Sequence, residues 1–125
     1  MHTLGCAVGR ADSKSTEYDS VKMYHIFKYR LDITDMQEIY LPKGAKILSV
    51  IFQVDQNVVA GSRENPYQLV LYAIVDKEQI KESRTIFIFG TGHSMNDRLL
   101  DKLKFIATVP EPVRPLIWHV FEYVG

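Results

Sequence analysis

The chain has 125 residues, of which 46% are hydrophobic, and its 15 basic and 15 acidic side chains give a formal net charge of zero. A chain of this length is typical of one domain, and it can bury roughly two-thirds of its unfolded surface. No stretch concentrates Lys and Arg as a nucleic-acid groove does, and no window approaches the roughly 18 uncharged apolar residues of a spanning helix. The sequence therefore argues against long DNA or RNA and a membrane as partners, and leaves a small anionic ligand open.

Residues 1–22, MHTLGCAVGRADSKSTEYDSVK, are expected to form a flexible N-terminal leader, because they show no sustained periodicity. From Met23 onward the chain is dense in β-branched and aromatic residues, so we expect a single β-rich domain at residues 23–125. The leader is either a flexible tail or the product of an upstream start codon. It contains Cys6, the single cysteine. One copy of the chain therefore offers no disulfide framework and no thiolate metal site, which suits a reducing, cytosolic compartment.

Turn residues divide the domain into short segments of strand-like composition, at intervals typical of a sandwich or barrel. We predict a mainly β fold, with a small antiparallel sheet or barrel-like domain of about seven strands and one short helix. The first three strands are expected to form a meander, and the fourth, apolar at nearly every position, a central strand. The strands are expected at residues 23–31, 36–41, 46–54, 67–76, 83–90, 104–109 and 116–124.

The helix is expected at residues 96–103, where Leu99, Leu100 and Leu103 form an apolar stripe. The link between the last two strands, residues 110–115, reads PEPVRP. Because proline fixes φ and removes a backbone donor, we expect no regular structure in this link.

The most informative local feature is residues 89–97, FGTGHSMND, where a strand runs into a glycine-containing turn and then a helix start. Such a junction can bind an anion, because glycines admit a phosphate to the backbone and the helix N-terminus offers unpaired N–H groups. It is neither the P-loop nor the dinucleotide fingerprint. A purely structural role also fits, with Ser94 as N-cap and Asp97 as its capping-box acid. Spacing alone favours that structural role.

The four histidines are the first candidates for a general base or a metal ligand. None of them has a second metal ligand or a catalytic partner at a diagnostic spacing in the sequence. Strand alternation places Trp118, Val120 and Glu122 on one face of the last strand and His119 on the other. We therefore interpret His119 as a packed or edge histidine. His93, in the glycine turn, is the better ligand-binding candidate. Because the folded part also lacks a nucleophile elbow, the sequence supports no catalytic site and no metal site.

Five arginines lie at strand ends or in loops: Arg30, Arg63, Arg84, Arg98 and Arg114. The prolines on either side of Arg114 stiffen the backbone and favour a preorganised donor fork, although an ordinary solvated arginine fits equally. Aromatic residues such as Tyr29, Phe87 or Phe89 are expected to be exposed and able to stack a base, although a β core also uses many aromatics.

Four blocks of sequence, taken in order, resemble a family of small phage proteins related to the Thoeris anti-defence sponges. The blocks are residues 26–29 (IFKY), 37–50 (QEIYLPKGAKILSV), 90–93 (GTGH) and 118–122 (WHVFE), so the similarity covers about residues 23–122. Members of that group assemble into oligomers, described as hexamers, which sequester cyclic ADP-ribose isomers made by bacterial TIR-domain immune enzymes without cleaving them. Some also hold cyclic oligonucleotides at separate sites.

The resemblance implies that this chain binds a cyclic nucleotide signal in the cytoplasm of an infected bacterium and suppresses Thoeris-type immunity. It implies a homo-oligomer, described as a hexamer, with no cofactor, no catalytic residue and no metal. The ligand-binding positions that it implies are Phe87, Thr91, Gly92, His93, Asn96 and Arg114, with Arg30 as a further pocket candidate and Arg63 at a second site. Phe89 can take the place of Phe87, and Asp97 that of Asn96.

Three hypotheses follow from the sequence. The first is the non-catalytic nucleotide sponge, which needs affinity rather than turnover. The second is a phage accessory protein that acts by protein–protein interaction, and the third is a small hydrolase of a cyclic nucleotide. Intact, absent or altered ligand after incubation with the protein distinguishes the three.

Overall fold

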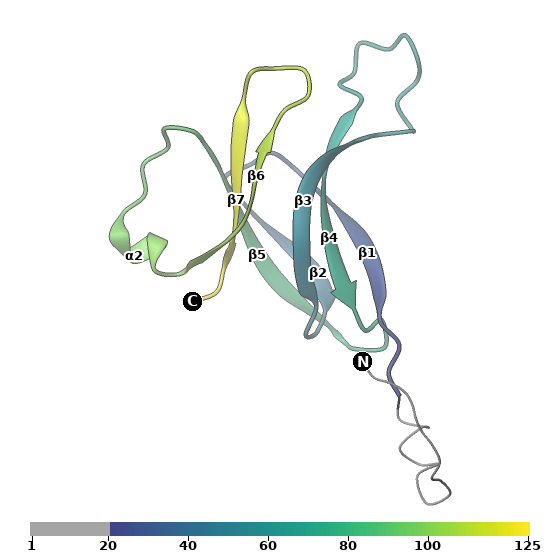
Figure 1. Cartoon of the computed structure of the whole chain (residues 1–125), viewed down its shortest axis with the longest axis vertical. Helices are drawn as coiled ribbons and strands as arrows, with labels where there is room; N and C mark the ends of the chain where they lie inside the picture. Colours follow the sequence, from purple (N-terminus) through teal and green to yellow (C-terminus); the bar gives the residue numbers. More distant parts are fainter. Residues whose placement is uncertain (1–20) are drawn as a thin grey trace, which may run out of the picture.

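The computed structural model describes residues 21–125, so Cys6, His2 and nearly all of the expected leader lie outside the described residues. Within residues 21–125, seven strands and one short helix follow in chain order (Figure 1). The strands are β1 (His25–Leu31), β2 (Met36–Pro42), β3 (Lys46–Val54), β4 (Tyr67–Val75), β5 (Lys81–Gly90), β6 (Leu103–Pro110) and β7 (Ile117–Tyr123), and the helix is α2 (Asp97–Leu100).

The strands form two antiparallel sheets that pack face to face, and they do not close into one barrel (Figure 1). One sheet has the order β1-β4-β3, and the other has the order β2-β5-β7-β6. The mainly β prediction is confirmed, as is the central place of β4. The predicted meander of β1, β2 and β3 is wrong, because β2 leaves the first sheet and pairs with β5 in the second. This crossing lets the two apolar faces cover each other.

The core lies between the sheets and follows the alternation of each strand. On β5, Ile86 and Ile88 point inward beside Val120 of β7, and they share one core cluster with the buried side chains of β4 in the other sheet. Burying each such side chain contributes about 1.5–3 kcal/mol relative to leaving it exposed. The core residues are Leu31, Ile39, Leu41, Ala45, Val50, Leu69, Leu71, Ala73, Val75, Ile86, Ile88, Val109 and Val120.

The helix and the proline-rich link differ from their predictions. The helix covers only Asp97–Leu100, and its N-cap is Asn96 rather than Ser94. Asn96 has the extended backbone of a cap, and its side-chain oxygen accepts from the Leu99 N–H at 2.8 Å. Pro110, the first residue of the link, is the last residue of β6 and pairs with Ile117. Because β6 is an edge strand, the sheet tolerates a proline there.

Among the residues that the structure describes, no helix is long and apolar enough to cross a membrane.

Candidate ligand-binding site

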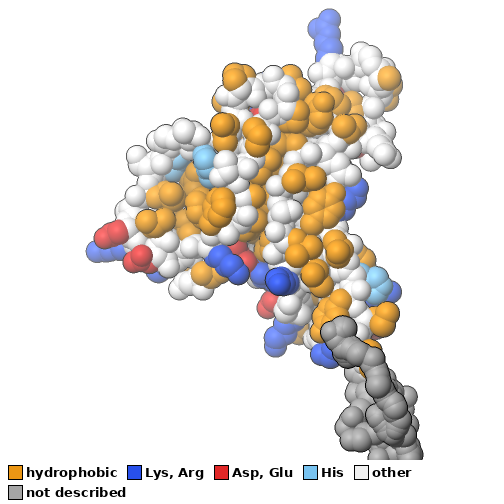
Figure 2. Space-filling view, in the orientation of Figure 1, with side chains coloured by type: hydrophobic (Ala, Val, Ile, Leu, Met, Phe, Trp, Pro, Cys, Tyr) orange, Lys and Arg blue, Asp and Glu red, His pale blue; other side chains and the backbone are white. Residues whose placement is uncertain are grey.

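An aromatic surface covers the side of the β2-β5-β7-β6 sheet that faces away from the core. We define this outer aromatic face by Phe87, Phe89, Phe105, Phe121 and Tyr123. Phe87 is paired in register with Phe121, and Phe121 with Phe105, so the three lie in a row across three strands. Figure 2 shows hydrophobic side chains gathered beside histidine over β6, β7 and α2. Such a surface offers π faces for stacking a planar ring.

The rings of the outer aromatic face contact one another. The centroid of Phe87 is 5.8 Å from that of Phe89 and 6.1 Å from that of Tyr123, and Phe105 is 5.6 Å from Phe121. Phe105 is 57% exposed, whereas Phe87 is half-buried and Phe89 is only 5% exposed. The expectation that Phe89 is exposed is therefore wrong, and Phe87 is the more accessible of the two alternatives.

The glycine turn after β5 explains why Phe89 is covered. Gly92 has a φ of +94°, a backbone conformation that favours glycine, and the His93 N–H donates to the Gly90 carbonyl at 3.1 Å. This turn places the His93 ring 4.6 Å from the Phe89 ring. His93 thus contacts the outer aromatic face, and both His93 and its neighbours in the turn remain exposed.

A histidine on β7 ties the turn to the sheet. His119 Nε2 lies 2.9 Å from Thr91 Oγ1, and His119 Nδ1 lies 3.0 Å from Thr108 Oγ1. The interpretation of His119 as a packed strand histidine agrees with these contacts, because both ring nitrogens have protein partners. Thr91, Gly92 and His93 are thereby held at the margin of the outer aromatic face.

Asn96 has a structural task at the end of the same turn. Its side-chain oxygen caps α2, so only the amide nitrogen is left to donate to a ligand. Asp97, the alternative to Asn96, lies in the first helical turn, where a carboxylate favours the helix N-terminus. Both side chains are exposed.

Arg114 lies in the loop between β6 and β7, where a buried carboxylate holds it. Its Nε and Nη2 donate to the two oxygens of Glu111 at 2.8 and 2.9 Å, and the Trp118 indole N–H donates to Glu111 at 2.7 Å. The Arg114 side chain is 58% exposed and that of Glu111 only 2%. Hydrogen bonds from Arg114, helped by the Trp118 donor, lower the pKa of Glu111 despite its burial, and Glu111 raises the pKa of Arg114.

Arg114 and Phe87 lie on different sides of the sheet. Trp118 shares a face of β7 with Val120, as alternation predicted, and in the structure this face points inward. Arg114 contacts the Glu111 carboxylate that Trp118 also binds. The loop that contains Arg114 joins β7 at Ile117, which is four residues before Phe121. The end of this loop therefore lies about 13 Å along the strand from the row of aromatic rings. One chain therefore does not bring Arg114 onto the outer aromatic face.

Arg63 lies beside Arg114 although the two were expected at separate sites. The loop between β3 and β4 meets the loop between β6 and β7 around an open pocket of about 520 Å³. Its lining residues are Arg63, Glu64, Asn65, Pro66, Val113 and Arg114. The structure thus places two guanidinium groups around one pocket.

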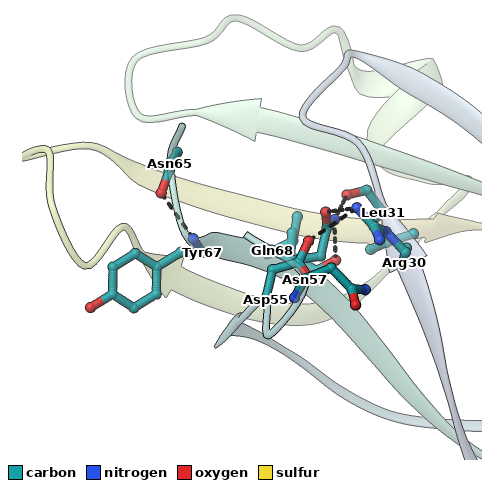
Figure 3. A network of polar contacts seen from close by, with 8 residues as sticks. Arg30, Leu31, Asp55, Asn57, Asn65, Tyr67 and Gln68 are labelled. Carbon is teal, nitrogen blue, oxygen red and sulfur yellow. Dashed lines mark hydrogen bonds and ion pairs between the residues drawn. The ribbon is translucent and has the colours of Figure 1, made fainter. Parts of the chain in front are cut away.

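Arg30 belongs to a third place, on the outer side of the β1-β4-β3 sheet. Its Nη2 donates to Gln68 Oε1 at 2.7 Å and lies 3.5 Å from Asp55 Oδ2, as Figure 3 shows. Gln68 in turn donates to the Leu31 carbonyl at 2.7 Å. Together with Lys28, these groups line a pocket of about 320 Å³ with both basic and amide donors.

An ion pair between Arg84 and Glu122 was not predicted. Arg84 Nε and Nη2 both donate to Glu122, the latter at 3.0 Å, and Nη1 donates to the Ala45 carbonyl at 2.9 Å. The hydrogen bond with Glu122 raises the pKa of Arg84, although desolvation acts against it. One sequence signal was available, since alternation places Glu122 on the same face as Val120, and a buried carboxylate needs a partner.

Tyr29 was expected to be exposed, but it packs against the core.

Metal ligation has no candidate within residues 21–125. No group of three or more His, Cys, Asp or Glu side chains in this part of the chain could hold a metal ion.

Comparison with protein families places the chain in one of them. Residues 23–125 match the family described as a domain of unknown function, DUF7352, and the chain belongs to that family. Neither the curated proteins nor the solved structures gave a match to this chain.

Proposed function

We propose that the protein binds a cyclic nucleotide immune signal, a cyclic ADP-ribose isomer made by TIR-domain enzymes, and sequesters it without degrading it. Acting in the cytoplasm of a phage-infected bacterium, it would suppress Thoeris-type immunity. The observation that carries the proposal is the half-buried Phe87, set in the outer aromatic face beside a fixed glycine turn. The resemblance of four sequence blocks to the anti-defence sponges supplies the ligand class.

The chemistry of such a ligand fits the groups on this surface. A purine offers a π face, and stacking of a base on an aromatic ring contributes about 1–3 kcal/mol. Its two phosphates need donors, which exposed backbone near Thr91 and Gly92 and the amide of Asn96 can supply. Sequestration requires only that these contacts hold the intact ligand.

We propose that the protein is a homo-oligomer, specifically the hexamer that the resemblance implies, and the placement of Arg114 supports this proposal. Because Arg114 and Phe87 lie on different sides of one chain, a ligand that touches both needs a second copy of the chain. Symmetric association places identical surfaces in repeated contact, and it would yield several equivalent pockets. Exposed apolar side chains such as Ile26, at 63%, and Phe105, at 57%, provide surface for this contact.

Arg30 suits a second ligand. Its pocket offers guanidinium, ammonium and amide donors to phosphates. We propose that cyclic oligonucleotides bind there, separately from the outer aromatic face, whereas Arg63 shares its pocket with Arg114 and would serve the same cyclic ADP-ribose isomer.

Calorimetric titration with a TIR-produced cyclic ADP-ribose isomer tests the proposal. Phe87→Ala is expected to weaken binding by roughly five- to 150-fold, because one stacked base is lost. Ile51→Ala, on the outer side of the β1-β4-β3 sheet and 45% exposed, is the matched control and should bind as wild type. Equal affinities of the Phe87 and Ile51 variants would refute the assignment of the outer aromatic face.

Asn96 needs a variant that keeps the helix cap. Asn96→Asp preserves capping of α2, since aspartate is an equally good N-cap, but it removes the amide donor and adds a charge beside the phosphates. We expect unchanged stability and weaker nucleotide binding. Unchanged affinity would remove Asn96 from the site.

A role in protein–protein interaction is the second candidate. The observation that favours it is the group of large apolar side chains left exposed in β1 and just before it: Met23 at 70%, Tyr24 at 59% and Ile26 at 63%. Binding of a host protein, with no affinity for the nucleotide, would favour this function over sequestration.

A further inference from the structure

We infer that Glu111 is a positioning residue that, together with Trp118, fixes the Arg114 guanidinium in the orientation in which it binds the phosphate of a nucleotide. The inference rests on the proposed function. It concerns a residue that touches no ligand and acts only through Arg114.

The contacts of Glu111 are those of a clamp rather than of a surface ion pair. Both of its oxygens accept from Arg114, through Nε and Nη2, and one of them also accepts from the Trp118 indole at 2.7 Å. With a side chain only 2% exposed, the carboxylate is shielded from water and from other cations. A bidentate pair of this kind fixes the plane of the guanidinium as well as its position.

The clamp leaves Arg114 able to bind. Glu111 uses two of the five N–H donors of the guanidinium, so the donors on Nη1 and the second donor on Nη2 remain. At 58% exposure, the side chain presents these donors to solvent at the edge of the pocket that it shares with Arg63. An arginine already ordered loses less rotamer freedom when a phosphate binds.

The backbone around the clamp is also fixed. The Glu111 N–H donates to the Leu116 carbonyl, and the Leu116 N–H donates to the Arg114 carbonyl, both at 2.8 Å. The indole that holds Glu111 packs on the end of β5, where a Cβ on Gly90 would lie 3.4 Å from the Trp118 ring. Trp118 therefore connects the Arg114 loop with the start of the glycine turn.

Glu111→Gln and Glu64→Gln form a matched pair of variants. Glu64 lines the same pocket as Arg114 and is exposed, but it makes no side-chain hydrogen bond to Arg114. Each variant removes one negative charge near the guanidinium, and only Glu111→Gln removes the bidentate clamp. Loss of charge alone should strengthen binding of an anion, whereas loss of orientation should weaken it.

The ligand-independent test is the NMR signal of the Arg114 Nε–H in the full chain. In wild type and in Glu64→Gln we expect a separate signal that is protected from exchange with solvent. In Glu111→Gln we expect that protection to be lost, with the circular dichroism spectrum unchanged. A wild-type signal that exchanges as fast as those of ordinary exposed arginines would overturn the inference, whatever the ligand does.

The binding test uses the TIR-produced cyclic ADP-ribose isomer. We expect Glu111→Gln to weaken binding about tenfold and Glu64→Gln to leave it unchanged or slightly tighter. In an Arg114→Ala background, Glu111→Gln should have no further effect, because there is no guanidinium left to position. Equal affinities of Glu111→Gln and Glu64→Gln would overturn the inference while the proposed function stands. Absence of binding by the wild type would overturn the proposed function. The contact between Glu111 and Arg114 would then be a structural ion pair with no role in ligand binding.

Discussion

The Arg84–Glu122 and Arg114–Glu111 pairs use the same chemistry in two different places. Between the sheets, Arg84 donates to Glu122 and to the Ala45 carbonyl, so all three of its guanidinium nitrogens already bind protein acceptors. In the loop after β6, Glu111 is buried and Arg114 is exposed. The comparison teaches that a bidentate pair serves the fold when both partners are enclosed, and can serve a ligand when only the acid is enclosed.

The largest effect is expected from breaking the enclosed pair. Arg84→Ala leaves the Glu122 carboxylate buried without its partner and should destabilise the protein by about 3–5 kcal/mol. Urea denaturation followed by fluorescence measures the loss.

The control for that variant is the double change Arg84→Met and Glu122→Leu. Replacing a buried ion pair by apolar residues of similar volume is often close to neutral, so the double variant should recover most of the lost stability. If Arg84→Ala lay within about 1 kcal/mol of wild type, the buried pair between β5 and β7 would not stabilise the fold as the account requires.

Trp118→Phe tests the Glu111–Arg114 pair, and an intermediate loss of stability is expected. The ring still packs on Gly90, but the Glu111 carboxylate loses the donor at 2.7 Å. A hydrogen bond to a charged group contributes about 1.5–3 kcal/mol, so thermal unfolding should show a loss in that range. A loss confined to nucleotide binding, with Tm unchanged, would show that the indole acts on Arg114 alone.

The pH dependence of stability separates the loop pair further. Because hydrogen bonds from Arg114 lower the pKa of Glu111 from its ordinary value of 4.5, the unfolded state takes up a proton first as pH falls. The resulting stability is fully present above pH 4.5 and is lost as pH falls through the lower pKa of the folded state. Tm profiles of wild type and Glu111→Gln should therefore differ near neutral pH and converge in acid. Parallel profiles would contradict the pairing.

The smallest effect is expected at the exposed pair of Arg30 and Asp55. Its atoms are 3.5 Å apart and the Arg30 side chain is 67% exposed, so Arg30→Gln should change the stability by about 0–1 kcal/mol. The same variant should weaken binding of a cyclic oligonucleotide, measured by fluorescence anisotropy. A large loss of stability would show that Arg30 stabilises the fold, as Arg84 does, rather than serving a ligand, as we propose for Arg114.

Local features of the fold were predictable because their signals are local. Alternation and turn residues predicted all seven strands to within two residues at each end. Alternation also predicted that Trp118 and Glu122 share a face of β7, and the structure turns that face toward the core. The pairing order was not predictable, since nothing in the pattern of β2 says that its neighbour is β5. Ser94 and Asn96 are both good caps by residue type, and it is Asn96 whose extended backbone and hydrogen bond from the Leu99 N–H make it the cap.

The candidate site was less predictable than the fold. The sequence indicated the glycine turn and Arg114 as places of interest, but burial of Phe89 depends on where His93 falls after the turn. Arg63 and Arg114 meet through two loops that are distant in the chain, and no local pattern reports such a contact. Glu111 was overlooked because a proline-flanked acid looks like an ordinary loop residue until its partners are seen.

The most direct test of sequestration is to recover the ligand. Purified protein is incubated with the TIR-produced cyclic ADP-ribose isomer, free nucleotide is removed by filtration, and the protein is denatured and its released contents are identified by liquid chromatography and mass spectrometry. Sequestration predicts that the intact cyclic molecule is released by wild type and is much reduced in Phe87→Ala. A chemically altered product would instead indicate an enzyme, and signal found unchanged in the filtrate would contradict nucleotide binding altogether.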